Sequence, residues 1–244
     1  IIEHADLCQF NIMKDEYELY LHNSDSIVVS DMKLKDLKNL IATGESSFLE
    51  FKHKVASPEK IAKEMVAFAN TNGGRILIGV NDNGELAGIE SYYEEEFWLN
   101  QAANDVCVPP INIKIEMVHA GKKDVLVVEV PESDNKPIAV KGKSKRTVYI
   151  RQEDENIIAT DDRVEILKNK TSTTGVTFEY GEREQQLFRF LNEYGDITIE
   201  RFSIISNITT YRAERILVDM ASAGVLDTYE QKGIVHYTFS HKNS

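Results

Sequence analysis

Along the first third of the chain, apolar residues recur either at every second position or at every third or fourth position. These two periodicities predict strands alternating with helices. Apolar residues alternate at Tyr17, Leu19 and Leu21, and an apolar run at 27–29 follows the polar stretch 22–26, which together predict a β-hairpin. Spacings of three and four residues over 34–41 and 58–69 predict two helices with one apolar face each. A short strand is predicted between them, at residues 48–52.

The expected ends of both helices carry residues that favour helix starts and stops. Ser30 or Asp31 can cap the first helix, because their side-chain oxygens can accept a hydrogen bond from a free backbone N–H. Gly44 can end it, since glycine adopts a positive φ at no steric cost. The second helix is expected to start at Ser57-Pro58, where proline loses no needed donor.

The middle of the chain predicts β-hairpins around one further helix. Asn72-Gly73-Gly74 breaks the second helix, and an apolar strand follows at 75–80. Asn83-Gly84 predicts a two-residue type I′ turn, because both residues tolerate a positive φ, and the chain is expected to return over 85–89. The remaining predicted elements are a helix over 93–106, a hairpin over 111–130, a strand over 148–151 and a helix over 161–167.

The pattern changes after a small, polar stretch at residues 169–177, which we interpret as a linker. Beyond it, three groups of helically spaced apolar residues are followed by two short strands, at 225–229 and 234–239. Three helices and a hairpin in this order are typical of a winged helix-turn-helix, in which the third helix enters a DNA groove. We therefore expect a winged-helix domain over 178–244.

Composition narrows the class of protein. The chain has 244 residues, 42% of them hydrophobic, with 40 acidic against 28 basic residues and a net charge of −12. This composition is typical of a soluble globular protein, and the predicted strands and helices place it in the mixed α+β class. No apolar run or leader predicts a membrane or secretory segment. Two cysteines, Cys8 and Cys107, do not predict a disulfide framework, so a cytoplasmic location is expected. The acidity means that any nucleic-acid contact must be local.

Two segments carry a family resemblance: GESSFLEFK at 44–52 and AFANTNGGRILIGVNDNG at 67–84. They resemble the Schlafen AlbA-type DNA-binding domain of bacterial regulators and Schlafen proteins, formerly described as a divergent AAA-type ATPase domain. The resemblance covers roughly residues 33–165 and implies a mixed domain of β-hairpins and packed helices, which in bacteria often precedes a winged helix. The expected organisation is a hairpin extension at 1–32, the AlbA-like domain at 33–168, the linker and the winged helix.

Three acidic residues have a catalytic interpretation. The resemblance implies that Glu45, Glu50 and Asp82 match the acidic positions of a metal-dependent ribonuclease in the Schlafen branch. Convergent carboxylates can hold Mg²⁺ or Mn²⁺, which activates water and polarises a phosphodiester. Lys52 shares a strand face with Glu50 and can neutralise a phosphate. The alternative is that these acids have ordinary structural roles before a strand and in a turn.

The glycines do not predict a nucleotide site. A phosphate-binding loop needs a lysine directly after its second glycine, and Arg75 follows Gly73-Gly74 instead. We expect these two glycines to make a tight helix-to-strand turn and Gly79 to make a close packing contact. No cofactor is expected, except Mg²⁺ or Mn²⁺ under the ribonuclease hypothesis.

One basic run offers a local footprint for nucleic acid, because no acidic residue interrupts it from Lys136 to Arg151. If the segment is extended, alternate lysines share one face, and Tyr149 is available for stacking on a base. The structural alternative is a solvated loop or a β-edge protected by lysines. The candidate phosphate contacts in this run are Lys141, Lys143, Lys145, Arg146 and Arg151.

The third helix of the predicted winged unit offers a second set of contacts. Thr210, Arg212 and Arg215 lie near its start, where a recognition helix places its base-reading side chains. Lys232 at the hairpin tip can reach a flanking phosphate. Acidic winged helices can instead serve in dimerisation or protein docking, so both interpretations stay open.

The hypothesis that combines these features is a non-enzymatic, DNA-binding transcriptional regulator that acts as a homodimer, because two-fold symmetry doubles the contacts of a single winged helix. RNA is a possible target in place of DNA. The alternative is a metal-dependent endoribonuclease using the acidic trio. A third hypothesis is a dimeric protein-interaction adaptor.

Overall fold

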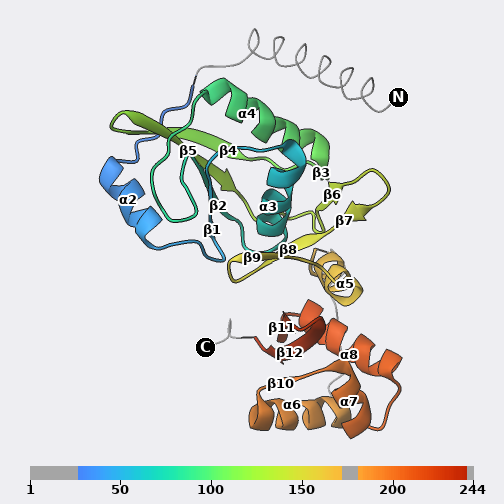
Figure 1. The fold of residues 1–244 in the computed structure, drawn as a ribbon. Helices are drawn as coiled ribbons and strands as arrows, with labels where there is room; N and C mark the ends of the chain where they lie inside the picture. The colour runs from blue at the N-terminus through green and yellow to red at the C-terminus, as the bar shows by residue number, and fades with distance from the viewer. Residues whose placement is uncertain (1–26, 172–180, 241–244) are drawn as a thin grey trace. The chain divides into compact units, whose positions relative to one another are not determined.

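The computed structural model describes residues 27–171 and 181–240, and these form two compact units. Among the described residues, the first unit comprises 27–133 and 138–157, and the second comprises 134–137, 158–171 and 181–240. Both helices and sheets are present, so the α+β class is confirmed (Figure 1). Most of the predicted hairpin at 16–29 and of the linker at 169–177 lies outside the described residues.

A four-stranded sheet lies at the centre of the first unit, in the order β1-β2-β5-β4. Its first two strands are parallel and the other pairs are antiparallel. Side chains alternate between the two faces, so Leu49 and Phe51 pack in one apolar cluster with Leu37, while Ile76 and Ile78 pack in the other. The strands are β1 (Leu49–Lys52), β2 (Gly74–Ile78), β4 (Lys114–Ala120) and β5 (Lys123–Val130).

The helices of this unit cover both faces of the sheet. α2 (Leu34–Ala42) contributes Leu37 to one face, and α3 (Pro58–Asn70) packs on the other with α4 (Tyr92–Gln101), which continues into a π-helical turn. Ser57 caps α3 as predicted, by accepting a hydrogen bond from the backbone N–H of Lys60. The predicted cap of α2 is wrong, because Lys33 takes the N-cap position and the Ser30 hydroxyl donates to Glu116 instead.

The predicted type I′ turn at Asn83-Gly84 is also wrong. The backbone N–H of Gly84 donates to the carbonyl of Asn81, and of these turn residues only Gly84 has a positive φ, of 79°. Three residues therefore connect the two arms, and the returning arm is reduced to a single bridge between Val80 and Leu86. The positive φ that requires glycine is therefore at Gly84, which follows the two central turn residues, whereas a type I′ turn would need a positive φ at both central residues.

Short strands complete the first unit. β6 (Ala139–Lys141) pairs with both β3 (Cys107–Val108) and β7 (Arg146–Thr147), so β6 and β7 form a hairpin. β8 (Tyr149–Gln152) follows directly and pairs with β9 (Glu155–Ile158). The basic run of the sequence therefore covers a hairpin and the start of a second strand pair.

The second unit is built from four helices and a three-stranded sheet. Phe202, Leu217 and Tyr237 are fully buried in its apolar core, to which Ile166 of α5 also belongs. The β10-β12-β11 sheet closes it, with β11 and β12 as an antiparallel hairpin. The elements are α5 (Asp161–Lys170), α6 (Glu182–Tyr194), β10 (Asp196–Ile197), α7 (Ile199–Ile205), α8 (Thr210–Ser222), β11 (Leu226–Gln231) and β12 (Ile234–Phe239).

Within residues 27–171 and 181–240, none of the helices combines the length and the apolar character needed to cross a membrane.

Candidate functional site

The β6–β7 hairpin carries the most concentrated positive charge of the first unit. Lys141 pairs with Arg146 across the hairpin, and the chain reverses through residues 142–145. Lys143 and Lys145 lie in this reversal, and all four basic side chains are exposed. The segment is therefore not extended throughout, which was the condition for a shared face of lysines, because the run folds back on itself and gathers its charges around a hairpin end.

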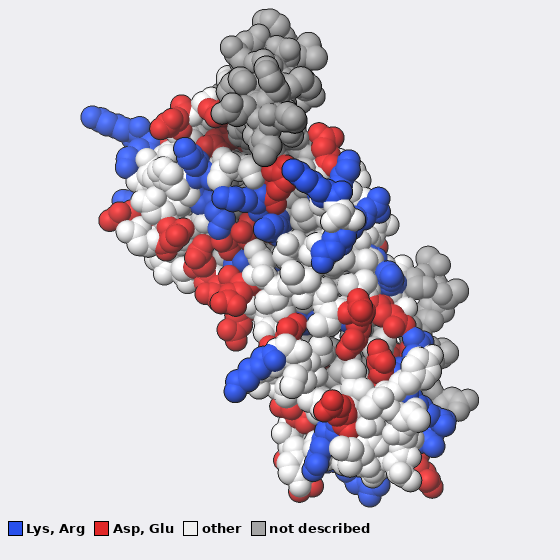
Figure 2. All heavy atoms as spheres, turned by 45° about the vertical axis from the view of Figure 1, so that its right-hand side comes forward, with Lys and Arg blue, Asp and Glu red and all other residues white. Residues whose placement is uncertain are grey.

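Glycine at position 142 makes this tight end possible. The backbone N–H of Gly142 donates to the carbonyl of Lys145, and a Cβ on this glycine would lie 2.6 Å from that oxygen. Figure 2 shows basic side chains on the right of the first unit, and both acidic and basic side chains on its left.

The ring of Tyr149, which the sequence offered for stacking on a base, already contacts other groups of the protein. Its ring is half-buried and packs against the main core of the unit. The ammonium of Lys63 lies 5.9 Å from the centroid of the ring. A base would have to displace this cation–π contact, so we leave Tyr149 out of the candidate interface.

Asn70, in the sequence segment that carries the resemblance, holds the basic hairpin on the rest of the unit. Its amide nitrogen donates to the carbonyls of Ile138 and Tyr149, at 2.8 Å each, and its amide oxygen accepts from the N–H of Ile138 at 2.7 Å. Asn70 is only 2% exposed. Thr71 adds a hydrogen bond from the backbone N–H of Arg151 to its hydroxyl. The end of α3 thus clamps the strands on both sides of the basic loop.

The neighbouring glycines make a close backbone turn. Gly73 has a φ of +70°, and a Cβ there would lie 2.9 Å from the carbonyl oxygen of Val130. A Cβ on Gly74 would lie 2.5 Å from the Phe68 ring. Gly79 has a φ of +96°, and a Cβ there would approach Gly88 to 3.1 Å. Protein atoms fill the space beside each of these glycines.

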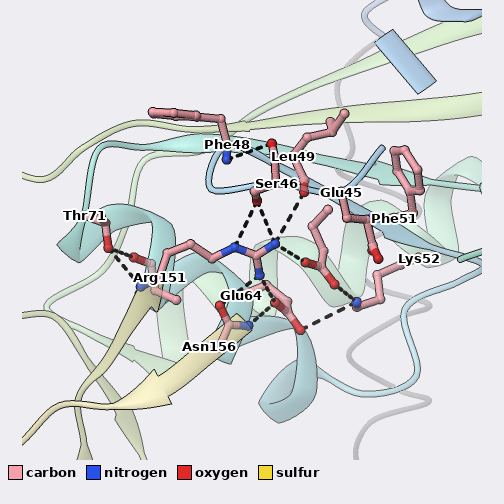
Figure 3. Close-up of polar contacts among 12 residues, drawn as sticks. Glu45, Ser46, Phe48, Leu49, Phe51, Lys52, Glu64, Thr71, Arg151 and Asn156 are labelled. Atoms are coloured by element: carbon pink, nitrogen blue, oxygen red, sulfur yellow. Dashed lines mark hydrogen bonds and ion pairs between the residues drawn. The ribbon is translucent and has the colours of Figure 1, made fainter. Parts of the chain in front are cut away.

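Arg151 lies inside the unit rather than on its surface (Figure 3). Its side chain is 1% exposed, and its guanidinium pairs with Glu50 at 2.7 Å. The same group donates to the carbonyl of Ser46 at 2.9 Å and lies 5.0 Å from the centroid of the Phe68 ring. Arg151 therefore cannot reach a phosphate from this position, and we leave it out of the candidate interface.

Lys52 belongs to the same group of charges, with 32% of its side chain exposed. It shares a strand face with Glu50, as predicted, and forms an ion pair with it. Its ammonium also lies 3.7 Å from Glu64, a carboxylate that accepts a hydrogen bond from Asn156. Burial alone would lower the pKa of Lys52, but the bond to Glu50 and the charge of Glu64 raise it above its ordinary value.

The acidic trio is not arranged as a single metal-binding group. Glu45 accepts a hydrogen bond from the backbone N–H of Phe51 at 2.9 Å, and it lines a surface cleft of about 910 Å³ together with Asp82 and two lysines. Burial raises the pKa of Glu45 against the effect of the Phe51 bond, and the charges of Glu50 and Asp82 add to the increase. Glu50 does not line this cleft. Throughout the part of the chain that the structure describes, no group of three or more His, Cys, Asp or Glu side chains is arranged to hold a metal ion.

In the second unit, the predicted contacts have different surroundings. Thr210 and Arg212 are exposed in the first turn of α8, where Thr209 caps the helix. Arg215 forms an ion pair with Glu165 of α5 and lies 3.5 Å from Asp219. Lys232 is exposed, with a φ of 54°, in the turn between β11 and β12.

Sequence reasoning missed one side chain beside these, Tyr211, which is 72% exposed. It lies between the exposed Thr210 and Arg212, whereas Ala213 is buried in the core. The helical spacing of the apolar residues already placed Tyr211 on the opposite face of α8, and this signal could have identified it.

The chain is similar to a known protein family over part of its length. The family described as Schlafen, AlbA_2 matches residues 45–160. This range contains the acidic trio, Asn70 and the whole basic hairpin. No curated protein matches the chain.

Two solved structures are similar to the chain. One is the N-terminal domain of a RecG-related protein from Nitrosomonas europaea, described as related to an ATP-dependent DNA helicase, with 24% identity and a TM-score of 0.41. The match covers 53% of this chain and 92% of that domain. The other is the DIP2311 protein from Corynebacterium diphtheriae, with 14% identity and a TM-score of 0.42. There the match covers 93% of this chain but 39% of that protein.

Proposed function

We propose that this chain is a DNA-binding regulator whose AlbA-like unit contacts backbone phosphates through the β6–β7 hairpin. The observation that carries the proposal is the exposed loop from Lys141 to Arg146, in which four of six residues are basic and none is acidic. The match of residues 45–160 to the Schlafen AlbA_2 family supports it. The exposed lysines of this loop suit phosphates, since lysine is a flexible point charge.

The net charge of −12 determines how such binding must behave. The field of the whole protein opposes a polyanion, so affinity depends on the few cations that lie at the contact. Each neutralised phosphate releases a counterion, and four contacts give a slope of about −3.6 for the logarithm of affinity against the logarithm of salt concentration. Binding should therefore be weak at physiological salt unless the second unit adds contacts.

We further propose that the second unit is a winged helix that supplies these contacts and the sequence preference. The order of α6, α7, α8 and the β11–β12 hairpin supports this assignment. Arg212 and Thr210 at the start of α8 and Lys232 at the hairpin turn are the candidate contacts. Arg215 is left out because Glu165 and Asp219 already neutralise it. A homodimer suits this proposal, because paired half-sites double the contact area.

The test compares two triple variants that make the same change in net charge. Lys141, Lys143 and Lys145 are changed to Gln in one, and the exposed Lys33, Lys35 and Lys122 are changed to Gln in the other. Fluorescence anisotropy with a labelled DNA duplex, over a series of salt concentrations, should show that the loop variant loses about 2.7 from the salt slope. The control variant should keep the slope of the unmodified protein.

Absence of duplex binding at low salt, or equal losses in both variants, would overturn the proposal. Arg212→Gln tests the second unit separately. A loss of affinity in this variant supports groove contact by α8. Unchanged binding favours the adaptor hypothesis for the second unit, in which the exposed Tyr211 serves protein docking.

A further inference from the structure

The carboxylate of Glu50 is already neutralised by two cations of the same chain. One oxygen pairs with Arg151 at 2.7 Å and the other with Lys52, and both of these cations are labelled in Figure 3. Glu50 itself is 7% exposed. Glu64, from α3, lies 3.7 Å from each of the two cations. Two negative and two positive charges therefore face one another in a largely buried cluster, which we call the β1–β8 lock.

A divalent metal does not fit this arrangement. To bind Glu50 it would have to displace the guanidinium or the ammonium, and the displaced cation would stay nearby and repel the metal. Moving Arg151 away from Glu50 would also break its hydrogen bonds to the carbonyls of Ser46 and Leu49 and its contact with the Phe68 ring. Breaking a buried ion pair leaves an uncompensated charge, which is strongly destabilising.

The other two acids of the trio, Glu45 and Asp82, line a surface cleft that Glu50 does not line. Phe51 packs in the apolar cluster with α2, so the preceding Glu50 and the following Lys52 project from the opposite face of β1 toward α3. Glu45 is held at the backbone of Phe51 and opens into the cleft that contains Asp82. The cleft therefore offers two carboxylates, and the lysines at positions 38 and 123 that also line it reduce its negative charge.

We infer that Glu50 in this chain is the anchor of a structural lock and not a metal ligand. The lock joins β1 to β8 and, through Glu64, to α3. β8 starts two residues after β7 ends, so the same lock positions the base of the basic hairpin. The acids that resemble a ribonuclease site are thus divided between a buried ion-pair cluster and a surface cleft.

Four single variants separate the lock from a metal site, because the two hypotheses group the acids differently. The lock groups Glu50 with Glu64, whereas a metal site groups Glu50 with Glu45 and Asp82. The full chain is unfolded thermally in EDTA and in millimolar MnCl₂. Unfolding is followed by the fluorescence of Trp98, which is the single tryptophan of the sequence and lies on α4 of the first unit.

We expect Glu50→Gln and Glu64→Gln to lower the unfolding temperature in EDTA, by about 10 °C for Glu50→Gln. Glu45→Gln and Asp82→Asn should change it by about 2 °C or less. Mn²⁺ should not raise the unfolding temperature of the unmodified chain selectively over these two cleft variants. Glu50→Leu combined with Arg151→Met should recover much of the loss, since an apolar pair can replace a buried ion pair of similar volume.

The inference is overturned if Mn²⁺ stabilises the unmodified chain and the Glu45, Glu50 and Asp82 variants all lose that effect. It is also overturned if Glu50→Gln is as stable as Asp82→Asn in EDTA. If Glu50→Gln does not fold, Glu64→Gln decides between the hypotheses, because Glu64 is outside the acidic trio. None of these unfolding temperatures depends on DNA binding. The experiment can therefore overturn the β1–β8 lock while the proposed function stands, and the DNA-binding test can overturn the proposed function while the lock stands.

Discussion

Replacing Asn70 with alanine tests the clamp that holds the basic hairpin. Three hydrogen bonds disappear together, two donated to the carbonyls of Ile138 and Tyr149 and one accepted from the N–H of Ile138. With Asn70 only 2% exposed, water cannot easily replace the amide. Each bond contributes about 1 kcal/mol net, and a buried group left without a partner costs about 1–3 kcal/mol. We therefore expect a loss of about 3–5 kcal/mol in the free energy of unfolding.

The loss is measurable by urea unfolding followed through the fluorescence of Trp98, which reports on the first unit alone. A loss of this size reduces the folding equilibrium constant by about two to four powers of ten. Asn72→Ala is the matched control, because Asn72 is the same residue type two positions away but is exposed. Its effect should stay within about 0.5 kcal/mol. If Asn70→Ala costs less than about 1 kcal/mol, or no more than the control, the clamp does not hold the hairpin.

Two other predictions concern separate parts of the chain. Gly74→Ala should destabilise the first unit by about 1–3 kcal/mol in the same urea assay, because the new Cβ would lie 2.5 Å from the Phe68 ring. An unchanged urea midpoint of unfolding would show that the ring moves aside freely. In the second unit, hydrogen bonds from His236 and Tyr229 lower the pKa of Asp196. The ionised Asp196 therefore stabilises the folded state at any pH above the ordinary aspartate pKa, and this stabilisation is lost as the pH falls through the lowered pKa of Asp196. Hydrogen exchange of β10–β12 peptides should accelerate over that acidic range, and Asp196→Asn should reduce this pH dependence; an equal dependence in both proteins would contradict the assignment.

The sequence predicted those features whose causes are local. Ser57-Pro58 starts α3 because capping and a fixed φ act within one turn, and the chain around Gly44 ends α2 for a similar reason. The prediction of a type I′ turn at Asn83-Gly84 was wrong because a two-residue and a three-residue connection both end in a glycine with a positive φ, so the sequence alone does not distinguish them. The cap of α2 failed because Ser30 found a partner 86 residues away, in Glu116.

Among the site residues, the sequence by itself determined where basic residues are concentrated and that Lys52 shares a strand face with Glu50. Only the tertiary structure decided which of the charges are free. Arg151 and Lys141 look alike in the basic run, yet one pairs with Glu50, 101 positions earlier, and the other is exposed. Likewise, Glu45 and Glu50 are five residues apart but lie in different surroundings, a surface cleft and a buried ion-pair cluster. The physical reason is that burial and ion pairing depend on residues brought together from distant segments, and the local pattern of a sequence does not record that distance.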